Sequence, residues 1–222
     1  MRLIFIVTIL VWPLAGSAET GSLFSAAREP LFGKAASAQG ASGRASLFSG
    51  DSGGLFAQPS RFTAAAVAHL RNVIGQAESP RAGYDAVQHG ARIKPPKLPT
   101  QMTLGEIFAW IEATPGQPHA IGRYQFIPET LRRVATQAGA RATDRFTPAI
   151  QDRLADVLLA DAGFGAFLAG DLSQKDFMDN LAAIWAGLPM ANGRSRYHGV
   201  AGNRATISRA YFVAEIAKIA PG

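Results

Sequence analysis

The chain contains no cysteine among its 222 residues. This absence excludes disulfide bonds, a catalytic thiol, cysteine-ligated metal and a lipid-modified N-terminal cysteine. The four histidines, at positions 69, 89, 119 and 198, show no paired spacing, so we expect neither a zinc site nor a metallopeptidase. The sequence also lacks the patterns of nucleotide-binding loops and of the serine-hydrolase elbow. We therefore expect no metal and no cofactor.

Charged residues make up only 17% of the chain, but their balance is basic, with a formal net charge of +6. No run of lysine and arginine is dense enough for a nucleic-acid-binding tract, so we expect no nucleic-acid partner. A basic surface also suits anionic lipid or the anionic polymer of the bacterial cell wall. Hydrophobic residues make up 48% of the chain, which is enough for a packed core.

Residues 1–18 are typical of a secretory signal peptide. A basic start at Arg2 precedes an apolar run over residues 3–14, and the small residues 16–18 predict cleavage before Glu19. The run is short and contains Pro13, so we expect no stable transmembrane span. An uncleaved membrane anchor is the alternative. The interpretation predicts export to the periplasm.

Residues 19–60 are rich in glycine, serine and alanine, and they show little periodicity. Such a segment cannot bury enough apolar surface to offset its ordering entropy, so we predict a disordered linker. Four Leu-Phe pairs interrupt it, and they could anchor an envelope partner or the chain's own catalytic domain, or recur by chance. The pairs begin at Leu23, Leu31, Leu47 and Leu55.

From residue 61 to residue 222 the pattern predicts a mostly helical domain with a small strand-and-loop region. Apolar spacing predicts a first helix over residues 62–77, which ends near Glu78 because Pro80 follows. A turn and a short strand are predicted over residues 84–90. Capping residues and apolar stripes then predict five more helices, namely residues 104–114 after Thr103, 128–138, a helix after Thr147, 174–185 after Ser173, and 206–220.

Glu78 is the candidate general acid. It stands at the end of an apolar helix, and no lysine or arginine lies three or four residues before it. Burial and the negative end of the helix dipole both favour the protonated carboxyl and so raise its pKa. A carboxyl that is protonated near neutral pH can protonate the leaving oxygen of a sugar. The alternative is an ordinary surface glutamate.

Several blocks of the sequence resemble known cell-wall enzymes. Residues 74–80 (IGQAESP), with the later G-x-x-Q of residues 122–125, resemble the motif pair of the lysozyme-like lytic transglycosylases. Residues 120–126 (AIGRYQF), 145–152 (RFTPAIQD) and 184–189 (IWAGLP) resemble, in order, three blocks of the lambda-phage endolysin family. The resemblance covers about residues 65–220. Residues 92–99 and 194–204 follow no pattern of that family.

The resemblance implies an α+β, predominantly helical lysozyme-like domain that cleaves peptidoglycan glycan strands by transglycosylation. It places Glu78 at the position of the family's only essential acid, and it places the next residue, Ser79, among the residues that bind the substrate. It also implies that Gln125 contacts the substrate or orients the cleft, and that Tyr124 lines it; an amide can bond an N-acetyl group in both senses. The alternative for Gln125 is a residue needed only for the turn, and the alternative for Tyr124 is an aromatic residue of the core.

Other residues are further candidates for substrate binding. Tyr84 could line the cleft, and Arg123 could pair with carboxylates of peptidoglycan or be an ordinary solvated charge. Tyr197 and His198 could rim the cleft. Trp185 is expected to be a core residue, and residues 151–152 are expected to tie the fourth helix to a neighbouring loop.

A hydrolase of the lysozyme type is the competing prediction, with Asp85 or Glu106 as the second acid. Asp85 could instead cap a turn, and Glu106 already fits a capping box with Thr103. A third interpretation is a non-catalytic wall-binding or scaffold protein that keeps the fold. The leading prediction is an exported lytic transglycosylase in which Glu78 is the single acid and base.

Overall fold

The computed structural model describes residues 61–200 and 202–220 of the chain. The predicted signal peptide, the linker and the Leu-Phe pairs lie outside the described residues. The described part is a mostly helical domain of seven α-helices. None of these helices combines the length and the apolar character needed to cross a bilayer.

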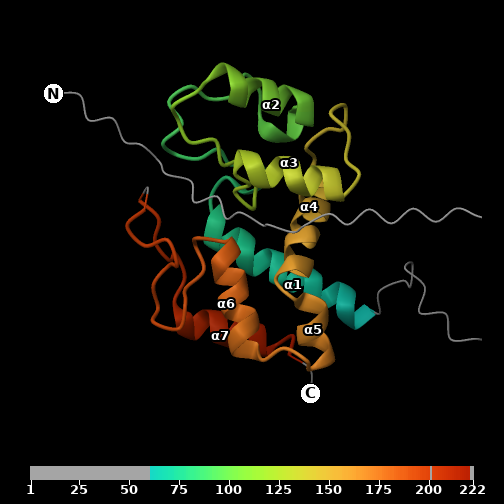
Figure 1. The fold of residues 1–222 in the computed structure, drawn as a ribbon, viewed down its shortest axis with the longest axis vertical. Coiled ribbons are helices and arrows are strands. Elements are labelled where there is room, and N and C mark those ends of the chain that lie inside the picture. Colours follow the sequence, from blue (N-terminus) through green and yellow to red (C-terminus); the bar gives the residue numbers. More distant parts are fainter. Residues whose placement is uncertain (1–60, 201, 221–222) are drawn as a thin grey trace, which may run out of the picture. The chain divides into compact units, whose positions relative to one another are not determined.

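The helices follow one another with two short 3-10 helices between the first and the second. In Figure 1, α2 and α3 lie at the top of the view, α5, α6 and α7 lie at the bottom, and α4 runs between them. α1 packs against both α4 and α7, and α3 packs against α4. The elements are α1 (Arg61–Glu78), η1 (Gly83–Asp85), η2 (Pro99–Gln101), α2 (Leu104–Ala113), α3 (Pro128–Gln137), α4 (Pro148–Asp161), α5 (Phe164–Ala169), α6 (Gln174–Ile184) and α7 (Arg209–Ala217).

Side-chain caps fix several helix starts where the sequence predicts them. Thr103 Oγ1 accepts a hydrogen bond from the N–H of Glu106, whose carboxylate accepts one from the N–H of Thr103, which completes the predicted capping box. Thr147 and Ser173 cap α4 and α6 in the same sense. The last helix starts later than predicted, at Arg209 with Ser208 as its cap.

The short strand predicted over residues 84–90 is wrong. The chain forms the helical turn η1 there, and Val87 makes only an isolated antiparallel bridge to Ile121. The described residues contain no sheet, because each such bridge stays a single pair without a neighbouring ladder.

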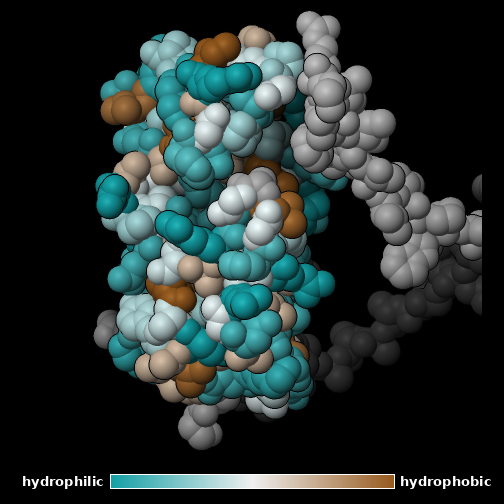
Figure 2. Space-filling model, turned by 90° about the vertical axis from the view of Figure 1, so that its left-hand side faces the viewer, coloured by the Kyte–Doolittle hydropathy of each residue, from teal (hydrophilic) through white to brown (hydrophobic). Residues whose placement is uncertain are grey.

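The core is apolar and continuous through both ends of the domain. Leu70 and Ile74 of α1 are completely buried, as are Phe146 before α4 and Phe212 of α7. The face shown in Figure 2 carries its hydrophobic residues as small separate areas among hydrophilic ones. The core therefore holds the C-terminal half of α1, and with it the position of Glu78.

Candidate active site

Glu78 is the last residue of α1, and its side chain lines a cavity of about 630 Å³. The two apolar residues that precede it on the inner face of the helix, Ile74 and Ala77, are buried. Pro80 follows two residues later, where the chain leaves the helix. The end of a rigid helix therefore fixes this carboxyl at the wall of the cavity, which we name the acid cavity.

The environment of Glu78 favours its protonated form. Burial raises the pKa of this carboxyl from 4.5 to about 7, although a hydrogen bond from the backbone N–H of Gly187 to Oε1 at 2.8 Å opposes the rise. Burial disfavours the charged form because the carboxylate loses hydration, whereas a donated hydrogen bond stabilises it. At neutral pH the group is therefore divided between acid and base, as general acid–base catalysis requires.

Among the described residues that line the acid cavity, Glu78 is the one carboxylate. His89 and Arg204 contribute an imidazole and a guanidinium group to the same lining. The remaining lining is polar or apolar and comes from Ala77, Gln88, Ala120, Gln125, Ile127, Ile184, Trp185, Ala186, Gly187, Tyr197, Gly202, Asn203 and Thr206.

Gly187 allows the close approach of the segment that follows α6 to the end of α1. A Cβ atom at this position would lie 2.6 Å from the carbonyl oxygen of Ala77 and 3.0 Å from Oε1 of Glu78. Thr206 ties the same backbone together, because its hydroxyl contacts the carbonyl oxygens of Ala77 at 2.6 Å and Gly187 at 3.2 Å. A side chain at position 187 would therefore displace the acid.

The turn over residues 122–125 brings Gln125 to the acid cavity. Gly122 has a φ of +77°, which glycine adopts without strain, and Gln125 has the unusual φ of +46°. Gln125 Nε2 donates to the carbonyl oxygen of Gly122 at 2.9 Å. Ser79 Oγ donates to the carbonyl oxygen of Arg123 at 2.8 Å, so the turn is joined directly to the residue after the acid.

Gln151 of α4 holds this turn from the other side. Its side chain is completely buried; its oxygen accepts from the N–H of Arg123, and its nitrogen donates to the carbonyl oxygens of Tyr84 and Phe146, all at 2.9 Å. These bonds confirm the prediction that Gln151 ties α4 to a neighbouring loop.

Four of the predicted substrate-binding residues do not line the acid cavity, namely Ser79, whose hydroxyl bonds the turn, and Tyr84, Arg123 and Tyr124. Tyr124 is 1% exposed, and its hydroxyl donates to Asp152 at 2.6 Å. Tyr84 donates to the same carboxylate at 2.9 Å, and Arg123 donates to the Tyr84 hydroxyl at 3.1 Å and to Asn72 at 2.8 Å. Burial and the Asp152 carboxylate raise the pKa of Tyr124. The hydrogen bonds among Tyr84, Arg123, Tyr124 and Asp152 therefore join α4 and the turn, and the bond from Arg123 to Asn72 adds α1.

Both candidates for a second acid have other local partners. Asp85 accepts a hydrogen bond from the N–H of Thr100 at 2.9 Å, and Glu106 pairs with Lys97 at 2.7 Å besides its role in the capping box. The Lys97 bond lowers the pKa of the exposed Glu106 carboxyl. Neither residue lines the acid cavity.

Trp185 is buried as predicted, and its indole N–H donates to the carbonyl oxygen of Tyr124 at 3.2 Å. Tyr197, predicted at the rim, lines the acid cavity from the segment between α6 and α7. Gly187 and Thr206 were not predicted as site residues. The block over residues 184–189 was the available signal for Gly187, but the sequence alone indicated only a structural role for it.

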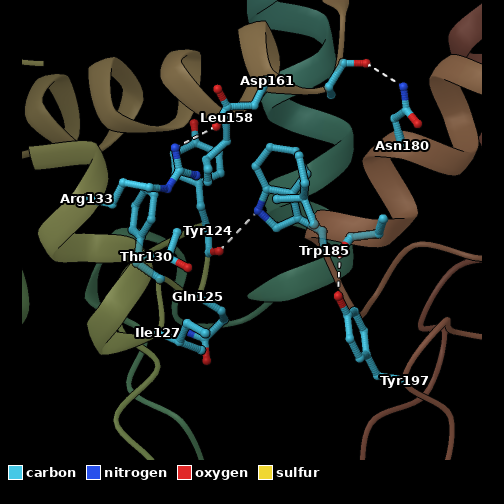
Figure 3. A pocket seen from close by; sticks show the side chains of 14 residues that line it. Tyr124, Gln125, Ile127, Thr130, Arg133, Leu158, Asp161, Asn180, Trp185 and Tyr197 are labelled. Carbon is cyan, nitrogen blue, oxygen red and sulfur yellow. Dashed lines mark hydrogen bonds and ion pairs between the residues drawn. The ribbon is translucent and has the colours of Figure 1, made fainter. Parts of the chain in front are cut away.

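A second cavity, of about 500 Å³, adjoins the first, and we name it the side cavity. Figure 3 shows Arg133 of α3 and Asp161 of α4 at its edge, joined by an ion pair of 2.8 Å. In the same view Asn180 of α6 donates to the carbonyl oxygen of Ala162 at 3.1 Å, and Tyr197 reaches the carbonyl oxygen of Ala183.

Within the described part of the chain, no three His, Asp or Glu side chains gather to hold a metal ion. Comparison of the sequence and the structure with protein-family models, curated proteins and solved structures finds no match.

Proposed function

We propose that this chain is a peptidoglycan lytic transglycosylase on a predominantly helical, lysozyme-like domain, with Glu78 as its single general acid and base. The observation that carries the proposal is a lone carboxyl with a pKa of about 7 at the wall of a 630 Å³ cavity. Such a group can both give and take a proton at neutral pH. The sequence blocks that resemble cell-wall enzymes supply the substrate class.

In the first step, protonated Glu78 donates its proton to the oxygen that links N-acetylmuramic acid to N-acetylglucosamine. The bond between this oxygen and the anomeric carbon breaks, and the oxygen leaves as the hydroxyl of N-acetylglucosamine. Positive charge develops on the muramic acid ring as an oxocarbenium-like species. The N–H of Gly187 stabilises the carboxylate that Glu78 becomes, since it already donates to Oε1.

In the second step, the 6-hydroxyl of the same muramic acid attacks the anomeric carbon. Glu78 takes the proton of that hydroxyl, which regenerates the acid and closes a 1,6-anhydro ring. Water is neither consumed nor released, so a second carboxylate that activates water has no role. This chemistry agrees with a cavity whose described lining holds one carboxylate.

Other residues of the acid cavity suit an anionic sugar polymer. Gln125 lines the cavity with an amide that can bond an N-acetyl group. Arg204 supplies positive charge, which attracts the peptide carboxylates of the wall, and the lactyl carboxylate where a muramic acid lacks its peptide. Export to the periplasm and recruitment by an envelope partner through residues 19–60 belong to the same proposal, and those residues lie outside the described part.

The test is the mass of the products that the protein releases from purified sacculi. A transglycosylase leaves anhydro-muramic acid ends, which lack one water relative to the reducing ends that a hydrolase leaves. The expected result is anhydro ends alone from the wild-type protein. Reducing ends would support the hydrolase instead, and intact sacculi after digestion would indicate a wall-binding or scaffold protein without activity.

A further inference from the structure

The side cavity adjoins the acid cavity, so a substrate held at Glu78 lies next to it. The two cavities have part of their walls in common, so they are direct neighbours. The shared lining residues are Gln125, Ile127, Ile184, Trp185 and Tyr197. A branch that projects from a polymer bound at Glu78 can therefore enter the side cavity.

The side cavity presents both signs of charge to a ligand. Arg133 and Asp161 stand 2.8 Å apart, and their side chains are 45% and 39% exposed. An ion pair this exposed is weak, because water solvates and screens both groups. A ligand that carries its own carboxylate and ammonium groups can therefore replace the pair, the carboxylate at Arg133 and the ammonium at Asp161.

The rest of the lining suits a short peptide. Thr130 and Asn180 bring a hydroxyl and an amide, which bond peptide groups. Leu158, Ala183 and Ile184 supply apolar surface for small side chains. The volume of about 500 Å³ lies within the range of roughly 300–1,000 Å³ typical of small-ligand sites.

We propose that the side cavity binds the peptide stem of peptidoglycan, with Arg133 on a stem carboxylate and Asp161 on a stem amine. The inference rests on the proposed function, because the stem is attached to the lactyl group of the muramic acid that Glu78 cleaves. The stem carries carboxylates, a free amine and small alanine side chains, which correspond to the groups of the cavity. The enzyme then prefers glycan strands that still bear their peptides.

The first experiment compares two substrates, namely intact sacculi and glycan strands from which an amidase has removed the peptides. The variant is Arg133→Met, and the matched control is Arg132→Met, because Arg132 lies on the same helix but pairs with Glu112 and does not line the side cavity. The expected result is a loss of about tenfold in kcat/KM on sacculi for Arg133→Met, as for one charge-assisted contact, and no loss on stripped strands. Arg132→Met keeps wild-type rates on both.

Two results would overturn the stem site while leaving the proposed function intact. One is an equal loss on both substrates, which would assign the side cavity to the sugar chain. The other is an unchanged rate on both. Cleavage of neither substrate by the wild-type protein would instead refute the proposed function.

The second experiment tests the stem site without catalysis. A soluble stem peptide with its free carboxylates and amine is titrated into the full protein, and binding is followed by NMR chemical shifts. The expected result is saturable shifts for backbone amides near Arg133 and Asp161, with binding weakened by about tenfold in Arg133→Met and unchanged in Arg132→Met. Absence of saturable shifts at these positions, or equal binding by both variants, would overturn the inference.

Discussion

The backbone N–H of Gly187 donates a hydrogen bond of 2.8 Å to the carboxylate of Glu78, although 109 residues separate them in the chain. Burial raises the pKa of Glu78, and this hydrogen bond lowers it. The net result is a pKa of about 7. The pKa of Glu78 thus depends on its burial and on a backbone hydrogen bond from a distant part of the chain.

Glu78 gives the stability of the protein a particular pH dependence. Its folded-state pKa of about 7 lies above its ordinary 4.5, so between these values the folded protein holds a proton that the unfolded chain has released. The free energy of unfolding therefore falls as the pH rises, by up to about 3 kcal/mol. Glu78→Gln has no such titration, so its free energy of unfolding should rise relative to that of wild type when the pH is raised from 4 to 8. Urea unfolding of both proteins at the two pH values measures this change.

Glu106→Gln is the control, and its effect has the opposite sign. The pKa of Glu106 is lowered by Lys97, so its ionised form stabilises the folded protein above the ordinary pKa. This variant therefore loses stability relative to wild type as the pH rises. Equal pH dependence in wild type and Glu78→Gln would show that the acid is not buried in solution.

The activity should fall above neutral pH. The first step needs the proton of Glu78, and a pKa of about 7 means that most of the acid is ionised by pH 8. We expect kcat/KM on sacculi to decline by about tenfold per pH unit on the alkaline side, measured at constant ionic strength. A rate that stays flat to pH 9 would exclude Glu78 as the proton donor.

Gly187→Ala should damage both stability and the pH profile. Its Cβ would meet the carbonyl oxygen of Ala77 at 2.6 Å, so relief of the clash costs about 1–3 kcal/mol in the free energy of unfolding. The same movement weakens the hydrogen bond to Glu78, which raises the pKa of the acid further. The alkaline limb of the activity profile then moves to higher pH.

Gly165→Ala is the matched control for that change, because an added Cβ in α5 meets no atom within 4 Å. Alanine is the better helix former, so this variant should be as stable as wild type or more stable by up to about 1 kcal/mol, with an unchanged pH profile. If Gly187→Ala behaves like Gly165→Ala, the close approach to Glu78 is not required.

Gln151→Leu should destabilise the domain by about 3 kcal/mol, because it removes the side-chain partner of three backbone groups, one of them buried and two partly buried. Thermal or urea unfolding measures the loss. Gln101→Leu, at an exposed position in η2, is the control and should change stability little. A loss no larger than that of the control would contradict the role of Gln151 as the support of the turn.

Sequence patterns predicted the helices that carry their own start and stop signals. Thr103 with Glu106, Thr147 with Pro148, and Ser173 are local capping signals, so they do not depend on the rest of the fold. α5 was missed because its six residues are all apolar or glycine and lack a polar cap; it lies between Gly163 and Gly170, both in left-handed conformation. Thr206, which the sequence predicts as the start of the last helix, instead donates its hydroxyl to the backbone carbonyl oxygens of Ala77 and Gly187.

The site was only partly predictable, because some of its features are local in the sequence and others depend on contacts between distant residues. The apolar helix before Glu78 and the proline after it are local signals, so the sequence placed an acid at a helix end, but position alone was equally compatible with an ordinary surface glutamate. The contact with Gly187 is made by tertiary packing, and nothing near Glu78 in the sequence specifies it. Tyr124 and Tyr84 share the carboxylate of Asp152, which sequence spacing does not show.

The most direct test of the account is the rate at which Glu78→Gln digests purified sacculi, beside wild type and the controls Glu106→Gln and Asp85→Asn. The glutamine keeps the size of the side chain and can still accept the Gly187 bond, but it has no proton to give. The account predicts that Glu78→Gln loses about 10²- to 10⁴-fold in rate while both controls stay near wild type. Digestion by Glu78→Gln at the wild-type rate, from a protein as folded as wild type, would contradict it.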